Sequence, residues 1–131
     1  MKTYLDTPAL VKLVVAERES AALKVYLRAV SADTLFTAAL ARTELVRAVA
    51  GAGARAVTQA RRILDGLDTV NITPGLLDAA ADLRPSSLRS LDAVHLAAAR
   101  RAGTELRVLL TYDNRMEAAA ADLGMAVEAP A

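Results

Sequence analysis

The sequence predicts an α/β fold in which helices cover both faces of a parallel β-sheet. Short apolar runs of strand character alternate with longer helical segments, and strands that are separated by helices pair in parallel. The chain has 131 residues, enough to bury a core without disulfides, and we expect one domain over residues 1–131. Ligands of such sheets usually bind at the carboxyl ends of the strands.

The first strand and the first helix meet at a carboxylate. The strand expected over Lys2–Leu5 ends at Asp6, and a helix is expected over Pro8–Ala16. Thr7 is its candidate cap, and Pro8 takes the first helical position, where a missing N–H costs little. A carboxylate between apolar segments is costly unless its charge is compensated. Asp6 is therefore either a turn residue or a ligand for a cation.

Glycine and proline divide the middle of the chain into elements. Gly51 and Gly53 end one helix, and Pro74 closes a strand. In order, the expected elements are a helix over Ser20–Val30, a strand over Leu35–Thr37, helices over Ala39–Ala50 and Ala54–Leu67, a strand over Thr69–Ile72 and a helix over Leu76–Leu83.

The last third of the chain repeats the alternation. Ser90 is the expected cap of a helix that Gly103 ends, and Asn114 and Glu117 have the spacing of a capping box. The expected elements are a helix over Leu91–Ala102, a strand over Leu106–Thr111, a helix over Arg115–Leu123 and a last strand over Met125–Val127.

Composition excludes several classes of function. The chain has no cysteine, which excludes disulfides, thiolate zinc sites and cysteine nucleophiles. A net charge of +1 and 3% aromatic residues do not fit a polycation that coats nucleic acid or a stacking platform for single strands. No phosphate-binding glycine motif is present. Without a signal peptide or a membrane-length apolar run, we expect a cytoplasmic protein with no membrane partner.

Four acids stand out because each lies in apolar sequence: Asp6, Glu44, Asp92 and Asp113. Each has an ordinary explanation as a turn, cap, helix-dipole or surface ion-pair residue. Convergence of all four on one sheet edge would require protonation or a bound cation. Oxygen ligands suit Mg²⁺ or Mn²⁺, and such a site activates water for attack on a phosphodiester.

The four stretches that hold these acids, YLDTPALVKL, ARTELVRA, LRSLDAVHLAAA and LLTYDNR, resemble in order and spacing the PIN-domain ribonucleases, and among them the VapC toxins of bacterial toxin–antitoxin pairs. The resemblance covers essentially the whole chain. It implies a three-layer α/β/α sandwich and Mg²⁺- or Mn²⁺-dependent endoribonuclease activity on tRNA or ribosomal RNA. It also implies a cognate VapB-type antitoxin that covers the site, and a homodimer.

The resemblance assigns roles to residues. Asp6, Glu44, Asp92 and Asp113 correspond to the acidic quartet that carries catalysis, with Asp6, Asp92 and Asp113 as metal ligands, and Thr111 corresponds to a supporting hydroxyl. The family usually has serine or asparagine where this chain has Pro8. Thr7 is a partial substitute for the lost side chain. The departure leaves open a catalytically weak module that binds RNA or antitoxin.

The sequence leaves two further roles open. His95, the one histidine, shares a helix face with Asp92. It either supports the site or contacts RNA, or it is a packed histidine whose ring nitrogens have hydrogen-bond partners. We favour the packed histidine. Four arginines flank the acidic motifs: Arg42, Arg47, Arg89 and Arg115. They either contact RNA phosphates or are ordinary surface residues.

Two other α/β classes fit the pattern less well. A receiver-type signalling domain needs an acidic pair at the first strand and a lysine after the last, and no lysine follows Lys24. A phosphatase with an aspartyl nucleophile usually has a second aspartate two residues after the first, where this chain has Pro8.

Overall fold

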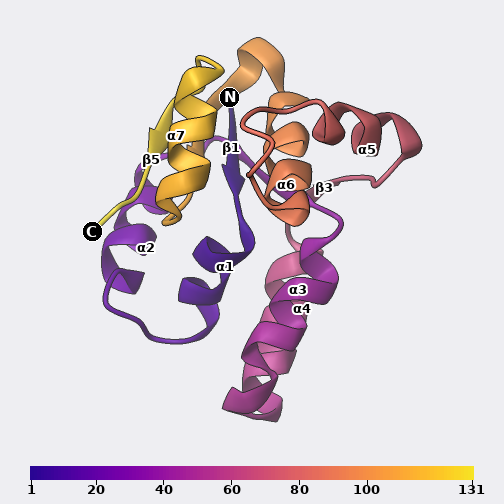
Figure 1. Ribbon diagram of the computed structural model, residues 1–131. Coiled ribbons are helices and arrows are strands. Elements are labelled where there is room, and N and C mark those ends of the chain that lie inside the picture. The colour runs from indigo at the N-terminus through magenta and orange to yellow at the C-terminus, as the bar shows by residue number, and fades with distance from the viewer.

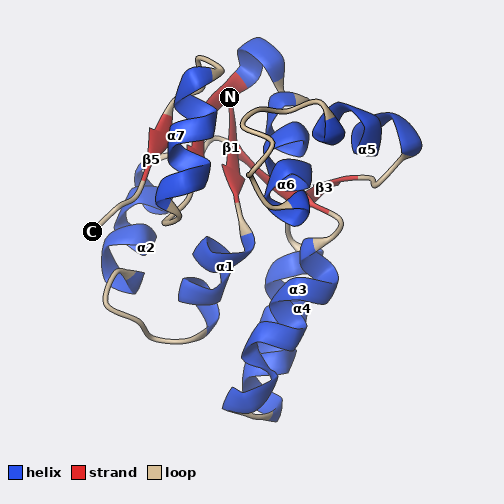
Figure 2. Cartoon of the chain, viewed as in Figure 1, coloured by secondary structure: helices blue, strands red, loops and turns tan.

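A five-stranded, wholly parallel sheet forms the centre of the computed structural model, which describes all residues from 1 to 131 (Figure 2). The strand order is β3-β2-β1-β4-β5. In chain order the strands are β1 (Lys2–Leu5), β2 (Thr34–Ala38), β3 (Asp68–Val70), β4 (Leu106–Leu110) and β5 (Val127–Glu128).

Helices cover both faces of the sheet, which confirms the expected α/β/α sandwich (Figure 1). The helices are α1 (Thr7–Val14), α2 (Ser20–Ala29), α3 (Ala41–Val49), α4 (Ala54–Asp65), α5 (Pro74–Ala81), α6 (Ser90–Arg100) and α7 (Asn114–Asp122). Helices α1 to α4 pack on one face, and α5, α6 and α7 pack on the other.

Alternation of side chains along the strands separates these two cores. Tyr4 and Leu109 point to the core under α5 to α7, whereas Leu5 and Leu110 point to the core under α1 to α4. All four are fully buried. None of the helices combines the length and apolar character that a membrane crossing requires.

The strand order places β1 at the point where the chain changes direction across the sheet. From β1 the chain moves outward to β2 and β3, and it then crosses back to add β4 and β5 on the other side of β1. The carboxyl ends of β1 and β4 therefore border a topological switch point, where ligands of open parallel sheets bind. Tyr4 pairs with Leu109, and Leu5 with Leu110.

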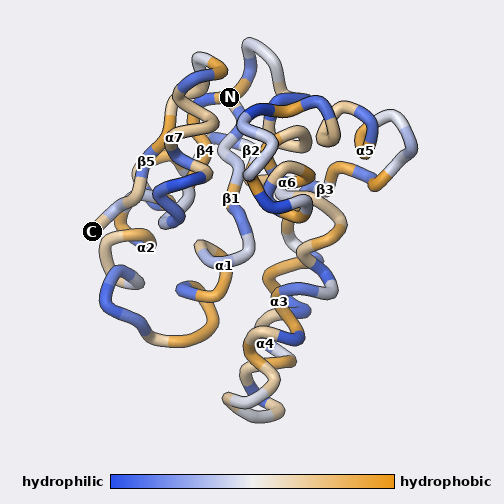
Figure 3. Tube along the Cα trace, in the orientation of Figure 1, coloured by the Kyte–Doolittle hydropathy of each residue, from blue (hydrophilic) through white to orange (hydrophobic).

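Helices α3 and α4 form a hairpin that projects from the body of the molecule (Figure 1). A 3₁₀ turn over Ala50–Ala52 and Gly53, whose φ is +103°, connect the two helices; that backbone conformation favours glycine. Each helix carries both apolar and polar residues (Figure 3). Leu45, Val49 and Leu64 are among the apolar residues buried in the core under α1 to α4.

Three expected helix caps are wrong, because nearby groups take those positions. Asp6 rather than Thr7 is the N-cap of α1, and Asp113 rather than Asn114 is the N-cap of α7. Ser90 is the first residue of α6, whose N-cap is Arg89 without a side-chain bond. Both aspartates immediately precede the first residue of their helix, so their carboxylates reach the free N–H groups first.

Asp33 ties together the opposite end of the sheet. Its carboxylate accepts hydrogen bonds from Thr3 of β1 and from the guanidinium of Arg107 on β4. The N-terminal ammonium of Met1 lies 3.6 Å from the same carboxylate. The Arg107 hydrogen bonds lower the pKa of Asp33 to about 2.

Candidate active site

Asp6 leaves the end of β1 and turns its buried carboxylate toward β4. One oxygen, Oδ1, accepts the Ala9 N–H at 2.9 Å, and Oδ2 accepts the hydroxyl of Thr111. Only 1% of Asp6 is exposed. The cap bond and the threonine hydroxyl therefore hold a carboxylate that has little contact with solvent.

Asp113 and Asp92 stand at the starts of two helices beside this point. Asp113 Oδ1 accepts the N–H groups of Arg115 and Met116, and its own N–H donates to Thr111 Oγ1 at 3.1 Å. Asp92 lies in the first turn of α6 and is half-buried. Thr111 thus links the two aspartates that follow β1 and β4.

Glu44 reaches the same region from α3. Its Oε1 accepts the Thr7 hydroxyl at 2.7 Å and lies 2.6 Å from His95 Nε2. The other ring nitrogen, His95 Nδ1, lies 2.6 Å from the Tyr4 hydroxyl. The surface ion pair with Arg47 that helical spacing allows is therefore replaced by an inward-facing network.

One concavity of about 660 Å³ brings these residues together. Asp6, Glu44 and Asp92 line it, and Asp113 does not, although its charge acts on both Asp6 and Asp92. Its remaining polar or charged lining consists of Thr7, Thr43, Arg47 and His95. Pro8 forms part of the exposed wall.

The environment gives the acids different affinities for protons. Burial raises the pKa of Asp6 to about 6, although the bonds from Thr111 and Ala9 oppose that effect. Burial and the neighbouring Asp113 charge also raise the pKa of Asp92. Burial acts in the same direction on Glu44, but the hydrogen bonds from His95 and Thr7 outweigh it and lower the pKa.

The donor set fits a hard divalent cation. No three carboxylate or histidine side chains lie close enough together to hold a metal ion as they stand. Mg²⁺, however, keeps several waters and needs only one or two carboxylates directly. The repulsion between Asp113 and each of Asp6 and Asp92 is the kind that a cation relieves.

The four candidate arginines have different surroundings. Arg47 lines the acidic concavity, whereas Arg42 lies 3.0 Å from Asp65 in an exposed ion pair. The charge of Arg89 lowers the pKa of Asp92, against the effect of burial. Arg115 lines a separate cavity beside the loop that contains Pro85. Among the four, Arg47 alone lines the concavity that holds the acids.

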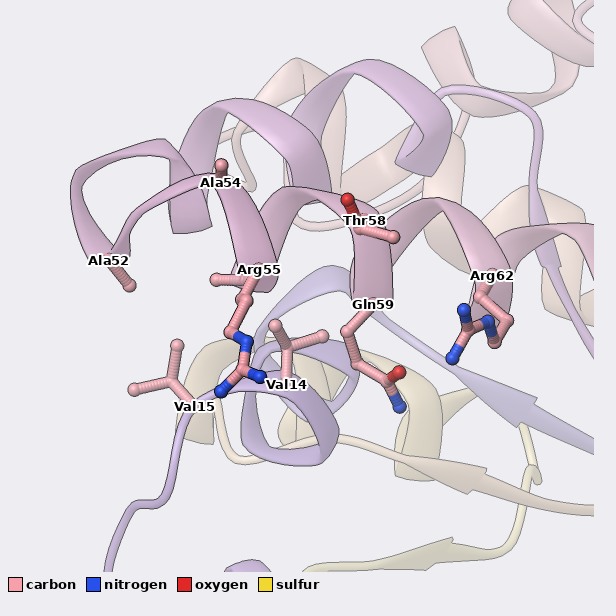
Figure 4. A pocket seen from close by; sticks show the side chains of 9 residues that line it. Val14, Val15, Ala52, Ala54, Arg55, Thr58, Gln59 and Arg62 are labelled. Carbon is pink, nitrogen blue, oxygen red and sulfur yellow. The ribbon is translucent and has the colours of Figure 1, made fainter.

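A second concavity of about 680 Å³ lies between the end of α1 and α4 and contains no acid (Figure 4). Arg55 of α4 lies beside Val14 and Val15 at the end of α1, and Gln59 and Arg62 follow farther along α4. Since it holds neither a carboxylate nor a histidine, it offers no acid–base or metal chemistry.

Tyr4 has a role in the site that was not predicted from the sequence. Tyr4 is fully buried in β1, yet its hydroxyl accepts the Ala38 N–H at 3.1 Å and contacts His95. The expectation that His95 is a buried, satisfied histidine is confirmed: it is 2% exposed and both ring nitrogens have partners. One of those partners is Glu44, so the histidine also belongs to the acidic site.

Comparisons with known proteins agree over nearly the full chain. The PIN-domain family model matches residues 3–122. Ribonuclease VapC46 of Mycobacterium tuberculosis is 49% identical over 127 residues, covering 97% of this chain and 96% of that protein. Ribonuclease VapC47 of the same species is 40% identical over 130 residues, with the same two coverages.

Solved structures show the same fold at lower identity. The crystal structure of Mycobacterium tuberculosis VapC20, a toxin that cleaves the sarcin–ricin loop, has a TM-score of 0.74 at 19% identity and covers 89% of this chain and 94% of that one. A toxin–antitoxin complex from Klebsiella pneumoniae has a TM-score of 0.69 at 20% identity, with 98% of both chains covered.

Proposed function

Because this chain belongs to the PIN-domain family and its full-length relatives are VapC ribonucleases, we propose that it is a metal-dependent endoribonuclease and the toxin of a toxin–antitoxin pair. One observation carries the proposal. Asp6, Glu44 and Asp92 converge on one concavity at the switch point of the sheet, with Asp113 adjacent. We take tRNA or ribosomal RNA as the substrate and the cytoplasm as the compartment.

The three aspartates are the proposed holders of Mg²⁺ or Mn²⁺, directly or through water. When bound, such an ion activates water and stabilises negative charge on a phosphodiester. Asp6 has the most fixed carboxylate, since Ala9 and Thr111 bond its two oxygens. Asp92 and Asp113 are anchored on two different helices, α6 and α7, and border the same region.

Glu44 is the proposed residue that orients the attacking water. Its Oε1 is held by Thr7 and His95, while Oε2 makes no hydrogen bond within the chain. A lowered pKa keeps Glu44 ionised near neutral pH, so Oε2 is able to accept a hydrogen bond or a proton. Arg47 is the best-placed phosphate contact, and Arg42, Arg89 and Arg115 are candidates farther along the RNA.

Two protein partners complete the proposal. A VapB-type antitoxin would block RNA by covering the acidic concavity, and a second copy of the chain would form a homodimer. The Klebsiella pneumoniae relative of the same fold was solved as a toxin–antitoxin complex, which supports the first partner.

The alternative is a catalytically weak binding module. Pro8 at the wall of the concavity, together with the lack of three acids at ligand distance, favours it. Metal-dependent cleavage decides between the two functions.

The test is a cleavage assay on total tRNA and ribosomal RNA with antitoxin-free protein, run with Mg²⁺, with Mn²⁺ and with EDTA. Asp6→Asn serves as the inactive variant, and Asp78→Asn, an exposed acid on α5, is the matched control. We expect discrete fragments that need metal, persist in the control and disappear in Asp6→Asn. Equal cleavage by Asp6→Asn, or cleavage in EDTA, contradicts the proposal. No cleavage with retained RNA binding favours the binding module.

A further inference from the structure

His95 lies at the centre of a chain of hydrogen bonds that connects the sheet to Glu44. The ring is buried in α6 and lies edge-on to the Tyr4 ring, with 6.0 Å between ring centroids. Tyr4 OH contacts one ring nitrogen and Glu44 Oε1 the other, each at 2.6 Å. With both nitrogens occupied, the ring has no lone pair left for a water or a substrate.

The partners determine which nitrogen carries the hydrogen. The Tyr4 oxygen already accepts the Ala38 N–H, so its own hydrogen is available for His95 Nδ1. A tyrosine hydroxyl is protonated near neutral pH, so this hydrogen is present. Glu44 is ionised and only accepts. The neutral ring that satisfies both contacts carries its hydrogen on Nε2 and donates it to Glu44.

Unlike Asp6 and Asp113, Glu44 has no backbone N–H that holds its carboxylate. Asp6 and Asp113 accept backbone N–H groups as helix caps, whereas Glu44 has a longer side chain on the projecting α3–α4 hairpin, is 23% exposed and bonds only to side chains. Its hydrogen bonds from Thr7 and His95 fix one of several rotamers.

We propose that His95 is a positioning residue for RNA cleavage, which holds Glu44 through Nε2–H in the tautomer that the Tyr4 hydroxyl selects. The proposal rests on the proposed ribonuclease function and adds a requirement to it. The donor must be at the Nε2 position, because only there does it reach Glu44. Loss of the donor lowers kcat and leaves KM for RNA nearly unchanged, since the ring is 2% exposed and both of its nitrogens already have partners within the chain.

Two substitutions of His95 distinguish a role in positioning Glu44 from a role in packing the core. In His95→Gln the amide nitrogen occupies roughly the place of Nε2, so the donor to Glu44 is kept. In His95→Asn the amide occupies roughly the place of Nδ1, so contact with Tyr4 is kept and the donor is lost. We expect kcat within about fivefold of wild type for Gln and a fall of about 10²-fold for Asn, the scale of a misplaced catalytic group.

The single histidine allows a measurement that does not depend on activity. One imidazole gives one set of ring ¹⁵N signals, and their shifts report the tautomer. We expect the Nε2–H form in the wild-type chain, and a mixture of forms in Tyr4→Phe. Tyr26→Phe, a half-buried tyrosine on α2, is the control and keeps the wild-type signals.

The outcomes distinguish this proposal from the proposed function. Suppose that the wild-type chain cuts RNA. If His95→Asn and His95→Gln then lose kcat equally, or if the loss of kcat follows the loss of unfolding temperature, His95 does not act by positioning Glu44. An Nδ1–H tautomer in the wild-type chain also overturns the proposal. If the wild-type chain cuts no RNA, the ribonuclease function fails, and positioning in RNA cleavage fails with it; the ring signals then still decide whether His95 holds Glu44.

Discussion

Thr111 donates its hydroxyl hydrogen to Asp6 across the gap between β4 and β1, although the two residues are 105 positions apart in the sequence. The same oxygen accepts the N–H of Asp113. One buried hydroxyl therefore orients the carboxylate of Asp6, which follows β1, and holds the backbone of Asp113, which follows the neighbouring strand β4.

Asp6→Asn is expected to stabilise the metal-free protein while it abolishes cleavage. The pKa of Asp6 is raised from 3.8 to about 6, so ionisation of Asp6 lowers the free energy of unfolding as pH rises from about 4 to about 6, and the loss is complete at pH 7. Asparagine keeps the cap and carries no charge. We expect unfolding in EDTA at pH 7.5 to shift upward by roughly 2–5 °C, and a lower midpoint contradicts this account.

Thr111→Val is expected to reduce cleavage by about tenfold or more, because Asp6 loses the hydroxyl that favours its ionised form. The partly buried N–H of Asp113 also loses its acceptor, which costs about 1 kcal/mol of stability. Thr111→Ser keeps the hydroxyl and is expected to retain cleavage within about threefold. Mn²⁺ titration of both variants measures the metal site separately, and equal affinities would show that Thr111 does not support it.

Arg47→Ala is expected to raise KM for RNA and to reduce the salt dependence of binding. A lost phosphate contact lowers the slope of log K against log salt by about 0.7 for a single strand. Arg28→Ala is the matched control, since Arg28 is exposed on α2 and does not line the concavity. Binding to RNA over a series of KCl concentrations, with the inactive Asp6→Asn background, measures both slopes; equal slopes would remove Arg47 from the RNA contact.

Asp33→Asn is expected to lower stability near neutral pH and to have little effect in acid. Because Arg107 lowers the pKa of Asp33 to about 2, the contribution of its charge is present above about pH 4 and disappears as pH falls toward 2. Arg107 is solvent-exposed, so we expect a loss of about 1 kcal/mol at pH 7. Denaturant unfolding of both proteins at pH 7 and pH 3 checks whether the difference shrinks in acid.

Periodicity and turn residues were sufficient to predict the order of the elements. Every expected strand and helix is present, with shifts of one or two residues at most ends, as for the helix expected over Leu76–Leu83 that spans Pro74–Ala81. The caps were less predictable because several polar residues compete at each helix start. At α1, Asp6 takes the cap and leaves Thr7 free to donate to Glu44.

The candidate site could be predicted in part because strand ends meet at one sheet edge. That rule brought Asp6 and Asp113 together, and the apolar surroundings of Glu44 and Asp92 indicated helices packed on the sheet. The bond between Tyr4 and His95 could not be predicted, since it joins residues 91 positions apart in a core where tyrosine is otherwise an ordinary apolar residue. A lone histidine in an apolar helix was the only signal.

The central position of β1 has a consequence for how the protein is made. Strand β1 can pair with β2 once residues 34–38 have been synthesised, but it gains its other neighbour, β4, only after residues 106–110. Contacts between such distant segments form slowly. Until Thr111 and Asp113 emerge, the nascent chain lacks the hydroxyl that holds Asp6 and the fourth acid beside it. The acidic centre is therefore completed only after residue 113 has been synthesised, and a nascent chain that stops before Thr111 has no assembled acidic site.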